Sequence, residues 1–143
     1  MQYLSTNLKQ TAKLAKRLVD FIHGGEIIAL SGDLGAGKTA FSQAIAKYLG
    51  IDRPVISPTF TIWQQYDCTH TIIKKLIHID AYRLLNGQDL IDLGINDWAG
   101  QKDTLIIIEW PEKIKDWLPS NTLFFSLKHH DDGRLFELPD CLN

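Results

Sequence analysis

The chain has 143 residues, which fits one domain, since domains usually contain about 100–200 residues. Hydrophobic residues make up 45% of the chain and charged residues 22%, a balance typical of a soluble globular protein and not of a disordered one. The formal net charge of −2 gives no overall attraction to nucleic acid or anionic membranes, so such a partner would require a local basic patch or another protein.

The cysteines and the N-terminus indicate the compartment. Cys68 and Cys141 are far apart and lack a metal-type pairing such as C-x-x-C, so we expect free thiols in a reducing environment. The residues after Met1 show no basic stretch followed by an apolar segment, and no segment has the roughly 20 apolar residues that span a bilayer. We therefore expect a cytoplasmic protein with no membrane contact.

The first predicted element is an amphipathic helix that begins near Asn7 and ends before Gly24. Asn7 and Gln10 have the spacing of a capping box. Apolar residues then recur along one face of the predicted helix, at Leu8, Ala12, Ala15, Leu18, Val19 and Ile22. We expect this face to pack against a sheet.

A strand, a glycine-rich loop and a helix follow. Residues 26–31 form a short apolar run typical of a buried strand, and residues 39–49 have helical spacing. Between them, residues 32–39 read GDLGAGKT, a full match to the phosphate-binding loop G-x-x-x-x-G-K-[ST]. The backbone N–H groups of such a loop and the helix N-terminus together form a positive concavity for phosphate oxygens.

The residue types of this loop suit a nucleoside triphosphate. Its glycines let the backbone approach phosphate without a Cβ in the way. We expect the Lys38 ammonium to contact the β- and γ-phosphates and the Thr39 hydroxyl to bind Mg²⁺. The motif predicts a nucleotide but no particular reaction. The predicted nucleotide-binding residues are Gly32, Asp33, Leu34, Gly35, Ala36, Gly37, Lys38, Thr39 and Ala40.

The rest of the chain predicts mostly strands. In chain order these are strands over 59–66 and 72–79, a helix over 88–93, a buried strand over 105–108, a helix over 112–117, and a hairpin of 123–127 with 135–138 that turns at 131–133. We therefore expect an α/β fold: a P-loop NTPase-like sandwich whose mixed sheet has a parallel core and attached antiparallel strands, flanked by helices. A single P-loop domain would span residues 1–143.

Two carboxylates at predicted strand ends are candidates for the metal site. Glu109 ends the most apolar run of the chain, and Asp80 ends the strand before it. A carboxylate at the end of a buried strand is costly to leave unpaired, so a cation would explain both. Alternatively, Glu109 could turn to solvent or cap the next helix, and Asp80 could pair with Arg83.

Three further residues have two interpretations each. Thr59, in the segment SPTF, could reach Mg²⁺ or the attacking water, or it could belong to a proline turn that leads into a strand. His78 could be a metal ligand or a strand residue satisfied by local hydrogen bonds. The second interpretation is favoured because no other His or Cys stands at metal-ligand spacing. Trp110 could lie near the nucleotide or close the core.

Taken together, these motifs resemble the TsaE family (older name YjeE), small bacterial P-loop ATPases needed for threonylcarbamoyladenosine (t6A) modification of tRNA. The resemblance covers nearly the whole chain up to Leu118. Its matching segments are GDLGAGKT at 32–39, SPTF at 57–60, HIDAYRL at 78–84, LGI at 93–95 and IEWPE at 108–112.

The resemblance implies catalytic roles for Lys38, Thr59, Asp80 and Glu109, and it implies that Thr39 and Glu109 are associated with the metal. It also implies ATP and Mg²⁺ as cofactors, the proteins TsaB and TsaD as partners, and tRNA as an indirect contact through them. The alternative is a small-molecule kinase that uses the same loop. Such kinases usually carry several arginines over the phosphates, whereas this chain has four in all.

Overall fold

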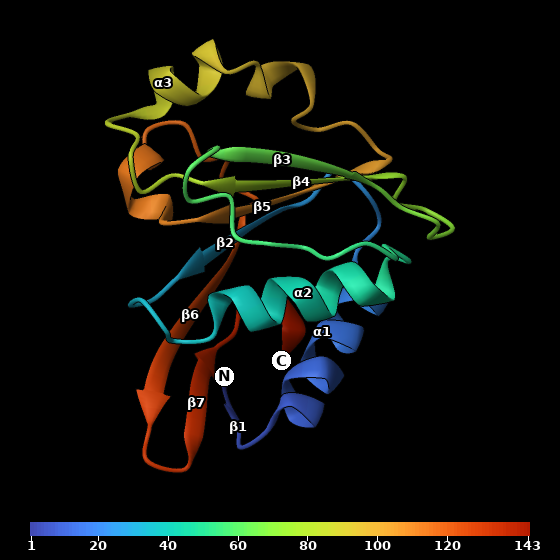
Figure 1. Cartoon of the computed structure of the whole chain (residues 1–143), viewed down its shortest axis with the longest axis vertical. Helices are drawn as coiled ribbons and strands as arrows, with labels where there is room; N and C mark the ends of the chain where they lie inside the picture. The colour runs from blue at the N-terminus through green and yellow to red at the C-terminus, as the bar shows by residue number, and fades with distance from the viewer.

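The computed structural model describes all 143 residues and contains a seven-stranded sheet in the order β1-β7-β6-β2-β5-β4-β3 (Figure 1). The strands are β1 (Gln2–Ser5), β2 (Ile27–Ser31), β3 (Trp63–Asp67), β4 (Lys75–Asp80), β5 (Thr104–Glu109), β6 (Leu123–His130) and β7 (Gly133–Glu137). The helices are α1 (Leu8–Phe21), α2 (Lys38–Tyr48) and α3 (Gly87–Asp92), with the short 3-10 helices η1 (Ile95–Asp97), η2 (Pro111–Ile114) and η3 (Asp140–Leu142).

The sheet has a parallel centre and antiparallel edges. Strand β2 pairs in parallel with both β5 and β6, and β4 pairs in parallel with β5. At one edge β7 and β1 are added antiparallel to β6, and at the other edge β3 is antiparallel to β4. The expected α/β sandwich with a mixed sheet and flanking helices is therefore confirmed.

Two hydrophobic cores fill the two faces of the sheet. The larger core joins α1 and α2 to one face, while the smaller joins α3, η1 and η2 to the other, as the helix positions in Figure 1 show. Because side chains alternate along a strand, Ile107 of β5 lies in the larger core and Ile106 and Ile108 in the smaller one. Glu109, two residues after Ile107, therefore lies on the same face as α2.

The first helix begins as expected. The Asn7 side chain accepts a hydrogen bond from Gln10 N at 2.9 Å, and Gln10 Oε1 accepts one from Thr6 N at 2.7 Å. Gln10 N belongs to the first helical turn and gains a partner from Asn7, while the Gln10 side chain bonds Thr6 N, one residue before the amide that a strict capping box would satisfy. None of the helices is both long and apolar enough to cross a bilayer, and both cysteines are free thiols, as expected.

The structure corrects the predicted start of two strands. Residues 59–62 form a turn, with Ile62 N donating to Pro58 O at 2.6 Å and Ile62 at φ 67°, so β3 begins only at Trp63. Residues 72 and 73 also lie in a turn, because His70 Nδ1 accepts from both of their amides at 3.2 Å. β-Branched composition favoured strands here, but local hydrogen bonds determine turns.

Two other elements differ from the prediction. The helix expected over 112–117 is only the 3-10 helix η2, which begins at Pro111. Strand β1 was not predicted, since its four residues QYLS carry no alternating pattern; it forms because β7 provides an edge for it to pair with.

The turn between β6 and β7 requires glycine at position 133. Gly133 has φ +158°, and a Cβ there would lie 2.1 Å from the Ser5 carbonyl oxygen at the end of β1. We predict that Gly133→Ala lowers the free energy of unfolding by about 2–3 kcal/mol. Urea unfolding measures this loss.

Gly100→Ala is the matched control. Gly100 also has positive φ, at +83°, but a Cβ there would meet no atom within 4 Å. The substitution should cost only the left-handed backbone penalty of about 1 kcal/mol. Equal losses at the two positions would contradict the close approach of β1 to the hairpin.

Candidate functional site

The phosphate-binding loop lies between the end of β2 and the start of α2, as its motif requires. Strand β2 ends at Ser31 and α2 begins at Lys38, with Gly37 as its N-cap at φ 107° and no side chain capping the first turn. The first amides of α2 are thus left without a side-chain partner, and they add to the positive end of the helix dipole. This arrangement favours binding of an anion.

Lys38 folds back into its own loop. Its ammonium donates a hydrogen bond to the Gly32 carbonyl and lies 4.1 Å from the centroid of the Trp110 ring. The residue is buried, and burial lowers the pKa of the Lys38 ammonium, while nearby carboxylates, Glu109 above all, oppose that shift. The charge is therefore held in the loop by a carbonyl and an aromatic ring.

Asp80 and Glu109 lie side by side at the ends of β4 and β5. The register pairs the two residues directly, and their exposed fractions are 5% and 3%. Asp80 accepts hydrogen bonds from Thr59 Oγ1 at 3.2 Å and from Tyr82 N at 2.9 Å. Glu109 Oε2 contacts His78 Nε2 at 2.8 Å and accepts from Ser57 Oγ at 3.4 Å.

The structure does not show the alternative roles that the sequence left open for Glu109 and Asp80. Glu109 is buried, so it does not turn to solvent, and no side chain caps η2 by a hydrogen bond. Arg83 forms no ion pair with Asp80; its guanidinium lies 5.2 Å from the centroid of the exposed Phe60 ring. Both carboxylates are thus held by hydroxyls, an amide and an imidazole instead of by a fixed arginine or lysine.

A single cavity of about 430 Å³, here called the phosphate cavity, brings these groups together. Of the predicted catalytic and metal-associated residues, all five line it: Lys38, Thr39, Thr59, Asp80 and Glu109. The loop contributes Leu34, Gly35, Gly37 and Ala40 to the lining as well, whereas Gly32, Asp33 and Ala36 do not line it. Residues up to 100 positions apart in the sequence, from Leu34 to Arg134, therefore line one polar site at the carboxyl ends of the parallel strands.

Trp110 lies between the cavity and the hydrophobic core, so its position is compatible with both interpretations that the sequence left open. It lines the phosphate cavity, and it also packs against the smaller hydrophobic core. Its backbone is left-handed, with φ 59° and ψ 52°, and its ring centroid is 5.0 Å from that of Tyr82. A non-glycine residue in this conformation is strained, and such strain is common at functional sites.

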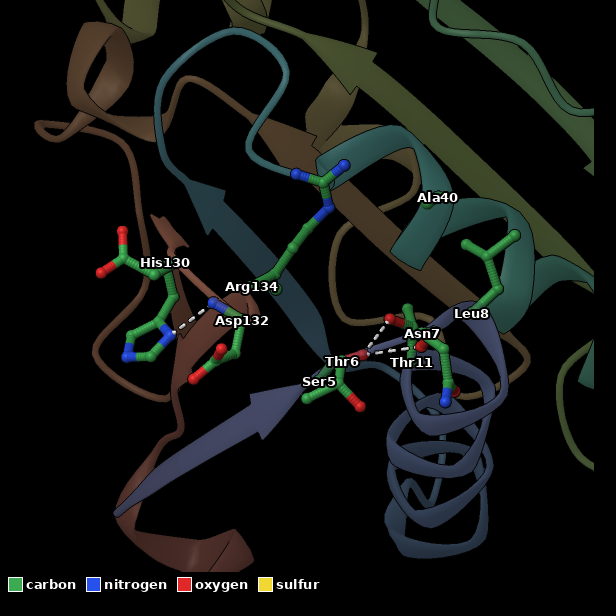
Figure 2. Close-up of a pocket in the computed structure, with 11 residues that line it drawn as sticks. Ser5, Thr6, Asn7, Leu8, Thr11, Ala40, His130, Asp132 and Arg134 are labelled. Carbon is green, nitrogen blue, oxygen red and sulfur yellow. Dashed lines mark hydrogen bonds between the residues drawn. The ribbon is translucent and has the colours of Figure 1, made fainter.

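Arg134 is a site residue that the sequence motifs did not indicate. Its Nη1 donates to the Gly35 carbonyl at 2.8 Å, and a Cβ at Gly37 would lie 2.4 Å from its Cδ. Figure 2 shows this side chain reaching from the hairpin to the loop. Arg134 lies 99 residues after Gly35, in a segment without distinctive motifs, so only the β6–β7 hairpin brings it to the loop.

A second cavity of about 450 Å³ adjoins the first (Figure 2). It lies between the start of α1 and the tip of the β6–β7 hairpin, and it shares Ala40 and Arg134 with the phosphate cavity. Most of its lining is polar, including Ser5, Asn7 and Asp131. The two cavities are thus neighbours that meet at Ala40 and Arg134.

The residues present suit a magnesium ion that arrives with phosphates. No group of three or more His, Cys, Asp or Glu side chains could hold a metal by itself. Mg²⁺ usually keeps several waters and takes one or two carboxylates together with substrate phosphates. Thr39 and Glu109 both line the phosphate cavity, and their hydroxyl and carboxylate would provide such an incomplete set of ligands.

Comparison with known proteins identifies the family. The sequence model of "Threonylcarbamoyl adenosine biosynthesis protein TsaE" matches residues 5–136. The chain belongs to the TsaE family. The resemblance carried by the five sequence motifs is therefore confirmed.

Individual TsaE relatives match along most of their length. The protein named tRNA threonylcarbamoyladenosine biosynthesis protein TsaE from Bacillus subtilis is 34% identical, over 92% of this chain and 80% of the relative. The protein of the same name from Rickettsia conorii is 37% identical, over 88% of this chain and 70% of the relative. The crystal structure of YdiB from B. subtilis superimposes with a TM-score of 0.76 at 33% identity, covering 95% of this chain and 82% of that one.

The buried position of Lys38 leads to a prediction about binding and stability. Lys38→Met keeps most of the aliphatic stem and removes the ammonium. We expect ADP affinity, measured by calorimetry, to fall about tenfold or more because a charge-assisted hydrogen bond to phosphate is lost. The free energy of unfolding without nucleotide should not fall at pH 7, because folding lowers the pKa of this ammonium and so disfavours its charged form.

The control is Lys47→Met, which changes an exposed lysine in the last turn of the same helix. It should leave ADP affinity unchanged. Unaltered ADP binding by Lys38→Met, or a large loss of stability, would contradict the assigned role of Lys38.

Proposed function

We propose that this chain is a Mg²⁺-dependent ATPase of the machinery that forms threonylcarbamoyladenosine in tRNA. The phosphate cavity carries the proposal, because Lys38, Thr39 and two buried carboxylates line one space next to a phosphate-binding loop. The link to tRNA modification rests on the TsaE relatives, whose names describe that biosynthesis. From the family resemblance we also propose TsaB and TsaD as partners, tRNA as a contact through them, and a cytoplasmic location.

The loop residues would bind the phosphates. Lys38 would exchange the Gly32 carbonyl for phosphate oxygens, because its ammonium is already held within the loop by that weak partner. The uncapped amides of α2 would add hydrogen bonds from the backbone. Arg134, which donates to the Gly35 carbonyl, would support the loop from the β6–β7 hairpin.

The carboxylates and hydroxyls would bind the metal and orient the attacking water. Bound ATP would supply the phosphoryl group transferred to water, with Mg²⁺ neutralising charge on the phosphates. Thr39 and Glu109 would hold the metal. Asp80 and Thr59, which already share a hydrogen bond, would orient the attacking water.

The second cavity would accept the nucleoside. Because it shares Ala40 and Arg134 with the phosphate cavity, a group joined to phosphates in the loop can extend into it. Its lining presents hydroxyl, amide and carboxylate groups from α1 and the hairpin (Figure 2). These groups can donate to and accept from a base or a ribose.

Hydrolysis fits the site better than transfer to a small-molecule acceptor. A kinase usually needs arginines over the transferred phosphate, and of the four arginines only Arg134 lines the phosphate cavity. Incubation with ATP and a metabolite panel tests this point, since only a kinase yields a phosphorylated acceptor.

The two carboxylates should have separable effects on activity. Glu109→Gln keeps the shape of the side chain and removes its charge, so we expect ATP turnover to fall at least about tenfold. ADP binding in the absence of metal should be unchanged. Asp80→Asn should also lower turnover, but with less effect on the Mg²⁺ concentration needed for half-maximal rate.

Steady-state phosphate release measures both effects, with Glu137→Gln as the control because this glutamate is exposed on β7. Parent-like turnover and Mg²⁺ dependence in Glu109→Gln would exclude Glu109 from the metal site. Absence of any ATP hydrolysis by the parent, alone and with partners, would refute the proposed activity.

The isolated chain should hydrolyse ATP slowly. Arg83 lies over the exposed Phe60 ring and Arg134 donates to the Gly35 carbonyl, so the chain itself orients neither guanidinium toward the transferred phosphate. A cation supplied by a partner can be worth about 10³–10⁵ in rate. We expect at least about a tenfold rise in ATPase rate when saturating TsaB and TsaD are added. An unchanged rate, with binding confirmed separately, would rule out stimulation by these partners.

A further inference from the structure

His78 forms the shortest polar contact of the Glu109 side chain. His78 Nε2 lies 2.8 Å from Glu109 Oε2, and the two side chains are 1% and 4% exposed. His78 lies in β4 two residues before Asp80, so both side chains lie on the face that carries α2. The other ring nitrogen, Nδ1, is buried and has no hydrogen-bond partner.

Packing alone does not explain a histidine at this position. The residue paired with it on β5 is Ile107, which is fully buried in the larger hydrophobic core. A buried polar atom without a partner costs about 1–3 kcal/mol, and an aliphatic residue would avoid that cost. The contact with Glu109 is the only hydrogen bond that the imidazole gains in return.

The two oxygens of the Glu109 carboxylate have different surroundings. Oε2 forms the hydrogen bond with His78 Nε2 and, at the longer distance of 3.4 Å, accepts one from the Ser57 hydroxyl. Oε1 takes part in no hydrogen bond within the protein, while the residue lines the phosphate cavity. A carboxylate can only accept, so Nε2 is the donor atom and the contact depends on the proton at that nitrogen.

We propose that His78 is a positioning residue for the metal site. It holds Glu109 by Oε2, so that Oε1 faces the phosphate cavity and is available to a divalent cation. This inference rests on the proposed function, in which Glu109 binds the metal. Partners of this kind around metal ligands typically change metal affinity or activity about 10–100-fold when they are removed.

Two substitutions of His78 distinguish its role as a hydrogen-bond donor from its role in packing. His78→Leu fills the space without a donor, while His78→Gln places an amide N–H at about the reach of Nε2. The measurement is Mn²⁺ binding to the protein–ADP complex by electron paramagnetic resonance, with ADP binding in EDTA and the melting temperature measured alongside. We expect His78→Leu to weaken Mn²⁺ binding about tenfold or more and to leave metal-free ADP binding unchanged. His78→Gln should recover most of the loss.

A double-mutant cycle with Glu109→Gln tests whether His78 acts through Glu109. In that background His78→Leu should cause no further loss of Mn²⁺ binding, because the carboxylate that it positions is already gone. Additive losses, or failure of His78→Gln to recover binding, would overturn the inference. A combined loss of metal-free ADP binding and stability in both variants would also overturn it, since His78 would then be a packing residue.

The outcomes separate this inference from the proposed function. If the parent binds neither ADP nor Mn²⁺ with ADP, the proposed function itself fails. If the parent binds both and His78→Leu binds Mn²⁺ equally well, only the role of His78 is refuted.

Discussion

The register of β2, β5 and β4 brings Leu30, Glu109 and Asp80 to one level of the sheet. The phosphate-binding loop starts two residues after Leu30, so the same level carries the loop and both carboxylates. A slip of β4 and β5 by one residue would turn Glu109 and Asp80 to the face of α3, away from α2 and the loop. Ile107 packs in the larger core and Ile106 and Ile108 in the smaller one, so aliphatic residues fill both faces of β5, and the pairing register is what places the two carboxylates beside the loop.

The carboxylates are buried next to a lysine, yet no ion pair joins them. Lys38 bonds a carbonyl and faces Trp110, while Asp80 and Glu109 bond hydroxyls, an amide and His78. Buried charges without a counter-ion are costly, and each of these neutral partners can be exchanged. Under the proposed function, a metal-bound nucleotide would bring the cation for the carboxylates and the anion for Lys38 together.

The sequence predicted the parts of the site that depend on local patterns. The loop motif lies within eight residues, and the carboxylates follow aliphatic runs that identify buried strands, so Lys38, Thr39, Asp80 and Glu109 were found without a structure. Arg134, the second cavity and the contact between His78 and Glu109 depend on chain segments that are distant in sequence. The turn at 59–62 was missed for another reason: its composition favours a strand, whereas the hydrogen bond from Ile62 N to Pro58 O determines its conformation.

The antiparallel edges of the sheet add side chains to the site that the parallel centre forms. On one side the segment before β3 carries Ser57 and Thr59 to the carboxylates, and on the other β7 carries Arg134 to the loop. These edge segments are held by turns and short strands, with β1 pairing only four residues to β7. The parallel centre, by contrast, is buried on both faces. Edge contacts are therefore the part of the site that costs least to move, while the loop and the two carboxylates stay fixed by the core.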